Sequence, residues 1–158
     1  MWLAALVLIS TAVLMWAVAA RVLILHWKIG DEYVHHWLSI AGVLFVGVYT
    51  PIYAYFKRRK PMSTPRLLKV HVFGNLLSFT SVSLHFTQQI TRPPQAYPDL
   101  GTGIVLYAAM LAMVGTGFAQ RYLGVRGIYT SLRFVHVGAA VTFYFTILVH
   151  MLHGFGII

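Results

Sequence analysis

Four histidines inside long uncharged, apolar stretches are the residues of this sequence best suited to bind a metal. They form two pairs with equal spacing: His85 is the fourteenth residue after His71, and His150 is the fourteenth after His136. On an α-helix, this spacing ends about 40° short of four turns, so both histidines of a pair share one face, about 21 Å apart along the axis. Two such helices side by side would hold four imidazoles at two levels, an arrangement that can clamp two haems.

The composition indicates that these helices lie in a lipid bilayer. Hydrophobic residues make up 59% of the 158 residues and charged residues 9%, and the mean hydropathy is +0.75, which is far more apolar than an ordinary soluble domain. Crossing about 30 Å of hydrocarbon takes about 20 residues. Five runs without Asp, Glu, Lys or Arg have that length and cover residues 1–20, 33–56, 70–91, 100–120 and 134–158.

Each run predicts one transmembrane helix, and together they predict an all-α membrane protein with five transmembrane helices in a haem-binding bundle. The predicted helices cover about residues 2–25, 36–56, 67–90, 102–121 and 131–155. Little chain remains outside them, so residues 1–158 are expected to form a single transmembrane domain. We expect an integral protein of the plasma membrane of a prokaryotic cell, surrounded by membrane lipid.

The distribution of basic residues predicts the orientation. Two of the short loops hold nine basic residues, and cytoplasmic loops are the ones enriched in Lys and Arg, so we expect the N-terminus inside and the C-terminus outside. These residues are Lys57, Arg58, Arg59, Lys60, Arg66, Lys69, Arg121, Arg126 and Arg133. The net charge of +9 lies between spans rather than on a soluble face, so we expect no nucleic-acid partner.

The order of the spans predicts which histidines meet. The third and fifth spans are separated by one span, so they cross the membrane in the same direction. His71 and His136 lie two and three residues after the last basic residue of their loops, near the cytoplasmic side. The expected ligand pairs are therefore His71 with His136 at the inner level and His85 with His150 at the outer level.

Two glycines of the fourth span match the histidine levels. Gly103 and Gly117 have the same fourteen-residue spacing as the histidines, with Gly117 at the inner level and Gly103 at the outer level. A residue without a side chain lets a flat macrocycle approach the backbone. The alternative is that both glycines serve helix packing, as glycines in membrane helices commonly do.

Three further residues are candidates for contact with the cofactors. Phe143 lies midway between the histidines of the second pair and would fall between the two haems, either as a core aromatic or as an electron relay. Lys69 and Arg133 could neutralise the propionates of the inner haem. Their other interpretation is interfacial snorkelling of long basic side chains.

The absence of cysteine narrows the cofactor chemistry. The sequence contains no cysteine, which excludes the C-x-x-C-H attachment of c-type haem, iron–sulfur clusters and thiolate ligation. Imidazole on both axial faces remains, so we expect two haem b groups. Two axial histidines leave the iron no open position, which suits electron transfer rather than oxygen binding.

Two stretches of the sequence resemble a known family. The stretches RLLKVHVFGNLLSFTSVSLHF and GFAQRYLGVRGIYTSLRFVHVGAAVTFYFTILVHMLHG resemble the haem-binding helices of the ferric reductase and NADPH oxidase transmembrane superfamily, over roughly residues 67–154. In that family the third and fifth helices carry the haem ligands, and cytochrome b of quinol-oxidising complexes uses a similar spacing. The family also has a sixth helix and a cytoplasmic flavin and nicotinamide domain, whereas this sequence has no G-x-G-x-x-G fingerprint. The resemblance implies a membrane cytochrome whose electron donor is on another polypeptide.

We therefore expect a di-haem b cytochrome subunit that passes electrons across the membrane between two redox partners, within a larger oxidoreductase complex. It is expected to be an electron-transfer subunit rather than a stand-alone enzyme. The basic segment 57–60 would dock an acidic partner subunit or bind anionic lipid.

The sequence is also compatible with other functions. One is a quinol- or quinone-reactive membrane anchor of a dehydrogenase or reductase. Its outer quinone pocket would be lined by His26, His35, His36, Gln88, Gln89 and His153. Interfacial histidines exposed to water are the other interpretation of that group. A more remote function is a histidine-box membrane enzyme with two non-haem irons, which would leave His71 and His136 unused. A transporter or structural subunit is weaker still, because the buried histidines lack acidic partners.

Overall fold

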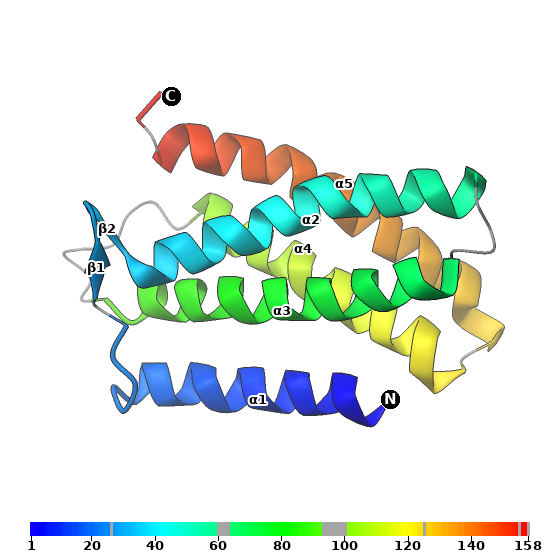
Figure 1. Cartoon of the computed structure of the whole chain (residues 1–158), viewed down its shortest axis with the longest axis horizontal. Coiled ribbons are helices and arrows are strands. Elements are labelled where there is room, and N and C mark those ends of the chain that lie inside the picture. The colour runs from blue at the N-terminus through cyan, green and yellow to red at the C-terminus, as the bar shows by residue number, and fades with distance from the viewer. Residues whose placement is uncertain (26, 60–63, 93–100, 125, 155, 158) are drawn as a thin grey trace. The chain divides into compact units, whose positions relative to one another are not determined.

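Five long α-helices make up most of the chain in the computed structural model, which describes residues 1–25, 27–59, 64–92, 101–124, 126–154 and 156–157 (Figure 1). All five are long and apolar enough to cross a membrane, as the charge-free runs predict. The elements are α1 (Trp2–Ala19), β1 (Lys28–Ile29), β2 (Glu32–Tyr33), α2 (Val34–Arg59), α3 (Thr64–Ile90), α4 (Gly101–Phe118), the π-helical turn η3 (Ala119–Leu123), the 3₁₀ turn η4 (Arg126–Ile128) and α5 (Tyr129–Gly154). The chain divides into two compact units, Met1–Arg92 and Pro93–Ile158.

The end of α1 differs most from the prediction. The helix stops at Ala19 instead of about residue 25, because Arg21 adopts a left-handed conformation with φ 59°. The N–H of Arg21 donates to the carbonyl of Val18 at 3.0 Å, and the N–H of Val22 donates to that of Ala17 at 2.9 Å. This pair of hydrogen bonds is a Schellman motif. Glycine is the usual residue at the left-handed position of this motif. Because arginine occupies it here, the sequence does not indicate that the helix ends at this point.

The other helices lie close to their predicted ranges. The helices α2, α3 and α5 begin two or three residues earlier than predicted. The α4 helix passes into the π-helical turn η3, which ends at Leu123 beside Gly124 with φ +58°. His26, Lys60 and the predicted end of the last helix at residue 155 lie outside the described residues.

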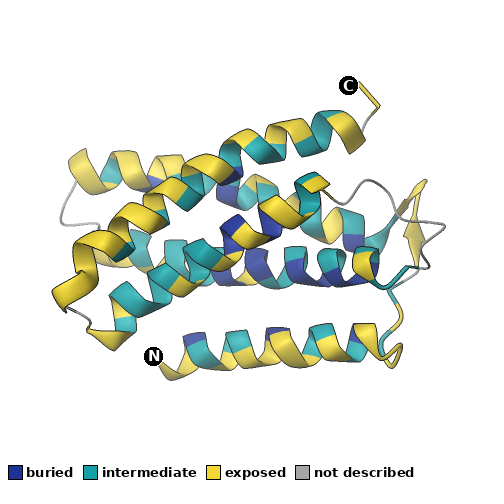
Figure 2. Cartoon of the chain, turned by 180° about the vertical axis from the view of Figure 1, so that it is seen from behind, coloured by how far each residue is buried: buried dark blue, intermediate teal, exposed yellow. Residues whose placement is uncertain are grey.

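In the first unit, α3 packs against both α1 and α2 and carries more buried residues than either, as the dark blue turns of Figure 2 show. Gly42 of α2 lies so close to α3 that a Cβ there would be 3.1 Å from a backbone oxygen, and a Cβ on Gly74 of α3 would overlap the Phe45 ring. A hydrogen bond of 2.7 Å joins the hydroxyls of Thr11 and Thr80. Small residues and interhelical hydrogen bonds are typical of helix packing in membranes.

A short antiparallel hairpin precedes α2. Its strands β1 and β2 pair Lys28 with Tyr33 and Ile29 with Glu32, and Gly30 takes a positive φ of 65° at the turn. The indole of Trp37 donates to the carbonyl of Ile29 at 3.0 Å and ties the hairpin to α2. The sequence did not predict these two-residue strands, which are too short to show an alternating pattern.

The second unit is built on the antiparallel packing of α4 and α5. Gly103 lies against His150, and Gly117 lies against His136. Because the two contacts have the same spacing along both helices, α4 and α5 keep one register over that whole length.

Candidate functional site

Both histidines of each pair face the neighbouring helix of their own unit. On α3, His71 stacks on a tyrosine of α2 with ring centroids 4.4 Å apart, and His85 contacts His35 near the start of α2. On α5, His136 and His150 both contact α4. The regular spacing therefore places each pair on one helix face. The predicted pairs His71 with His136 and His85 with His150 each join the two units, and they stay predictions.

His136 is held through its Nδ1 atom. This nitrogen lies 3.0 Å from the carbonyl oxygen of Met113 and 3.1 Å from Oγ1 of Thr116. A carbonyl can only accept, so Nδ1 carries the proton and the lone pair of the ring lies on Nε2. A Cβ on Gly117 would lie only 3.2 Å from Cε1 of the imidazole, so glycine makes room for the ring.

His150 has the same kind of environment. Its Nδ1 atom lies 2.9 Å from Oγ1 of Thr102, and a Cβ on Gly103 would be 3.6 Å from its Cε1. Each paired histidine of α5 therefore has a threonine at its Nδ1 atom and the following glycine beside its ring. The sequence analysis identified the two glycines and missed the threonines. The available signal was the tripeptide Gly-Thr-Gly, which occurs at residues 101–103 and again at residues 115–117.

The surroundings of His71 come from its own helix and from α2. Its Nδ1 atom lies 3.1 Å from Nδ2 of Asn75, one turn along α3, and its ring stacks on Tyr53 with an interplanar angle of 15°. Oδ1 of Asn75 is buried and has no hydrogen bond within the described part of the chain. Exchanging the oxygen and nitrogen of this amide would place Oδ1 against Nδ1 of His71, where it could accept a hydrogen bond from that N–H.

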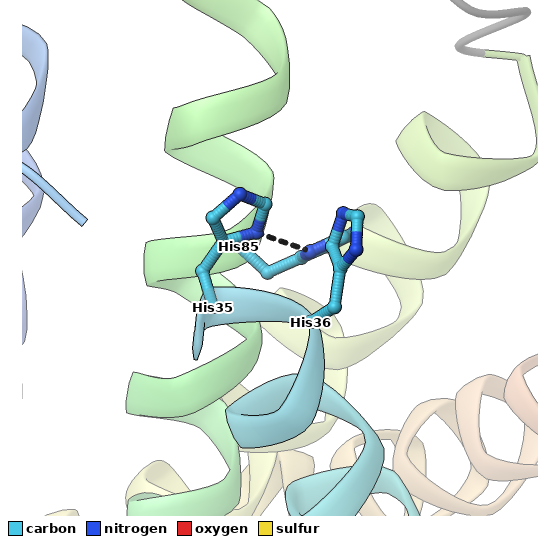
Figure 3. Close-up of side chains that lie close together, drawn as sticks. All are labelled: His35, His36 and His85. Carbon is cyan, nitrogen blue, oxygen red and sulfur yellow. Dashed lines mark hydrogen bonds between the residues drawn. The ribbon is translucent and has the colours of Figure 1, made fainter. Parts of the chain in front are cut away.

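His85 contacts a second buried histidine. Its Nδ1 atom lies 3.1 Å from Nδ1 of His35, a residue only 1% exposed. His36 follows on the same turn of α2, and the ligand nitrogens of all three histidines lie within 4.8 Å of one another (Figure 3). The sequence had placed His35 and His36 in an outer quinone pocket. It gave no sign that His85, fifty residues further along, would join them.

One feature is common to all four paired histidines. In each of them Nδ1 faces a polar partner: Asn75 for His71, His35 for His85, Met113 and Thr116 for His136, and Thr102 for His150. A hydrogen bond at one ring nitrogen selects the tautomer and orients the other nitrogen toward a metal. Among the four, the carbonyl partner of His136 directly places the proton on Nδ1 and the lone pair on Nε2.

The other predicted site residues have varied surroundings. Phe143 is 1% exposed and packs edge-on against Tyr144 with ring centroids 6.0 Å apart. Lys69 and Arg133 are exposed. Their predicted contacts with haem propionates, and the relay role of Phe143, stay predictions.

Two of the residues predicted to line a quinone pocket contact each other within the first unit. His36 and Gln89 contact each other at 3.1 Å, while Gln88 is buried on α3. His153 is exposed on α5 and belongs to the other unit.

Comparisons with family models, with curated proteins and with solved structures find no match to this chain.

Proposed function

We propose that this chain is a di-haem b cytochrome subunit that carries electrons across a membrane for a larger oxidoreductase complex. The observation that carries the proposal is the common environment of the four paired histidines. All four have Nδ1 against a polar partner, which is the usual arrangement of a metal-ligating histidine.

The donor set fits haem b. His71, His85, His136 and His150 would hold two haems through Nε2, and the lack of cysteine in the sequence excludes covalent c-type attachment. When bound, haem supplies a centre that gains and loses one electron. The chain contributes four imidazole ligands, glycines beside the two paired imidazoles of α5 and an apolar surrounding.

The outer surface of the helices supports a membrane location. Phe134 and Phe145 of α5 are 79% and 72% exposed, and Trp2 of α1 is 81% exposed. Burying such side chains in lipid removes their apolar surface from water. We propose an orientation with the N-terminus inside and the C-terminus outside, because the basic loops are then cytoplasmic.

The basic end of α2 is the proposed cytoplasmic contact surface. Lys57, Arg58 and Arg59 form its last turn. The ammonium group of Lys57 lies 5.7 Å from the Tyr53 ring centroid, and the guanidinium of Arg59 lies 5.6 Å from that of Tyr55. These cation–π contacts hold the charges at the helix surface, where they can attract anionic lipid or an acidic partner subunit.

Haem content tests the proposal. The purified full-length chain should contain two haems that acid-acetone extracts, and its reduced spectrum should show sharp low-spin bands. Iron without haem, or no iron at all, would contradict the proposal.

A second experiment tests the dependence on partners. In liposomes, NADH or NADPH alone should leave the haems oxidised, and a quinol or a partner subunit should reduce them. Rapid reduction by the nicotinamide alone would rule out a dependent electron-transfer subunit.

A further inference from the structure

Three imidazoles meet at one end of the first unit, where α2 begins and α3 approaches its end. His35, His36 and His85 can each offer one nitrogen to a common point, since these atoms lie within 4.8 Å of one another (Figure 3). His35 is 1% exposed, and the other two are partly buried. We propose that this cluster is a binding site for a divalent transition-metal ion, distinct in its chemistry from haem coordination.

The contact between His35 and His85 has nearly the spacing of two metal ligands. Their Nδ1 atoms are 3.1 Å apart. In a tetrahedral site with Zn–N bonds of about 2.0–2.1 Å, two ligand nitrogens lie about 3.3–3.4 Å apart. Only one proton fits between the two Nδ1 atoms. A metal bound to both Nδ1 atoms takes the place of that proton, which moves to Nε2 of the same ring, so that each neutral imidazole then carries its single proton on Nε2.

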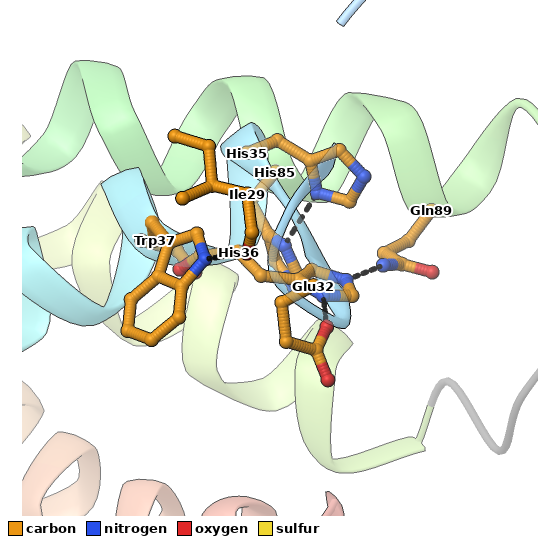
Figure 4. Close-up of polar contacts among 8 residues, drawn as sticks. Ile29, Glu32, His35, His36, Trp37, His85 and Gln89 are labelled. Carbon is orange, nitrogen blue, oxygen red and sulfur yellow. Dashed lines mark hydrogen bonds and ion pairs between the residues drawn. The ribbon is translucent and has the colours of Figure 1, made fainter. Parts of the chain in front are cut away.

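The third imidazole is held in the tautomer that a metal needs. The carboxylate of Glu32 accepts from Nδ1 of His36, and the amide of Gln89 donates to its Nε2 atom at 3.1 Å (Figure 4). The proton of His36 is therefore on Nδ1, and its lone pair is on Nε2, where a metal ion would displace the amide N–H of Gln89. A carboxylate behind a ligating histidine is a common second element of metal sites, because it orients the ring and raises its basicity.

A further polar atom beside the cluster lacks a partner. Oε1 of Gln89 is buried and makes no hydrogen bond to any residue that the structure describes. A water molecule bound to the metal is a hydrogen-bond donor and would satisfy this oxygen. Three histidines and one water complete the tetrahedral coordination that Zn²⁺ adopts in open sites.

The surroundings allow an ion to enter and balance its charge. The side chain of His36 is 25% exposed, and that of Glu32 is 51% exposed, so the cluster opens toward the hairpin. Asp31 and Glu32 at this position are two of the three acidic residues of the sequence. Imidazole ligands favour zinc, copper, nickel and cobalt, whereas magnesium and calcium prefer oxygen ligands.

His85 is shared with the proposed haem site. A metal on Nδ1 puts the proton of His85 on Nε2, the nitrogen that the proposed function assigns to haem iron. The metal ion and the haem at His85 therefore exclude each other.

Equilibrium dialysis of the full-length chain, prepared without haem, against Zn²⁺ tests the site. One tightly bound zinc per chain is expected, and Mg²⁺ should not replace it. The His36→Ala variant should bind zinc at least tenfold more weakly, and Glu32→Gln should weaken binding about tenfold. The His153→Ala variant is the matched control and should bind like the unchanged chain. Zinc binding that His36→Ala leaves unchanged, in a variant of unchanged helical content, would overturn the site.

Haem addition to the zinc-loaded chain separates the two proposals. Release of zinc as the second haem binds is expected if His85 is shared. One zinc and two haems bound together would overturn the exclusion and remove His85 from the haem ligands, while the zinc site would stand. Failure of the haem-free chain to bind zinc, when the same chain takes up two haems, would overturn the zinc site alone.

Discussion

The two units present their paired histidines in different ways. On α5, both histidines meet the same element of α4: Thr116 and Gly117 contact His136, and the equivalent Thr102 and Gly103 contact His150. On α3, the two histidines have unrelated neighbours. His71 uses an asparagine of its own helix and a stacked tyrosine, and His85 uses the buried His35.

The second unit repeats one structural element at both of its paired histidines, whereas the first unit surrounds each of its paired histidines differently. A threonine-glycine pair on α4 supplies both a hydrogen-bond partner and room for the ring, and a single antiparallel register repeats it. On α3, the Nδ1 atoms of the two paired histidines have different hydrogen-bond partners. The level of His85 also carries two additional imidazoles, those of His35 and His36. We therefore propose that the second unit serves one kind of ligand, whereas the first has a level where haem iron and a second metal ion would compete for His85.

The largest effect is expected from filling the space beside His136. In Gly117→Leu, the new side chain must displace an imidazole that already lies 3.2 Å from a Cβ at this position. We expect haem content to fall from two per chain to one. Gly115→Leu is the control, because a Cβ at Gly115 meets nothing within 4 Å, and leucine favours a helix more than glycine does. Equal haem content in both variants would contradict the role of Gly117.

A smaller effect is expected from removing the threonine hydroxyls. Thr102→Val takes away the hydroxyl at Nδ1 of His150, whereas His136 keeps the carbonyl of Met113 in Thr116→Val. Loss of a partner behind a metal ligand commonly weakens metal binding about tenfold or more. Haem transfer to a scavenging apoprotein should therefore be about tenfold faster in Thr102→Val, and Thr116→Val should change it less. The reverse order would show that Nδ1 contacts do not govern haem retention.

The smallest effect is expected at His71, where a stacked ring holds the imidazole as well. With the amide of Asn75 oriented so that Oδ1 accepts from Nδ1 of His71, Asn75→Leu removes that acceptor, which makes the imidazole a weaker electron donor to iron and favours reduced iron. We expect the potential of the inner haem to rise by roughly 30 mV. For a one-electron couple, a tenfold change in the equilibrium constant for reduction corresponds to about 59 mV, so the expected rise is about half of that. Ser81→Ala, whose hydroxyl bonds only the carbonyl of Leu77 among the contacts described for it, should leave the potential unchanged. A fall in potential in Asn75→Leu would contradict the assigned hydrogen bond.

Charge-free runs predicted the five helices well, because the demand for an apolar span is the strongest signal in such a sequence. The features that the sequence analysis missed depend on local geometry. Arg21 ends α1 in a conformation that usually indicates glycine, and the hairpin strands are only two residues each.

Site residues were predictable only where they repeat along the chain. The spacing identified the histidines and the glycines of α4, and the threonines were missed although they repeat with the glycines. The convergence of His35, His36 and His85 depends on how α2 and α3 pack over fifty residues of sequence. No spacing rule along a single helix contains that information.

The pairing of histidines from the two units is the central claim, and redox titration of three variants tests it most directly. His71→Ala and His136→Ala should each retain one haem, with the same potential in both. The double variant should retain that haem too, because both histidines hold the same iron. A double variant that has lost both haems, or single variants whose remaining haems differ in potential, would contradict the pairing.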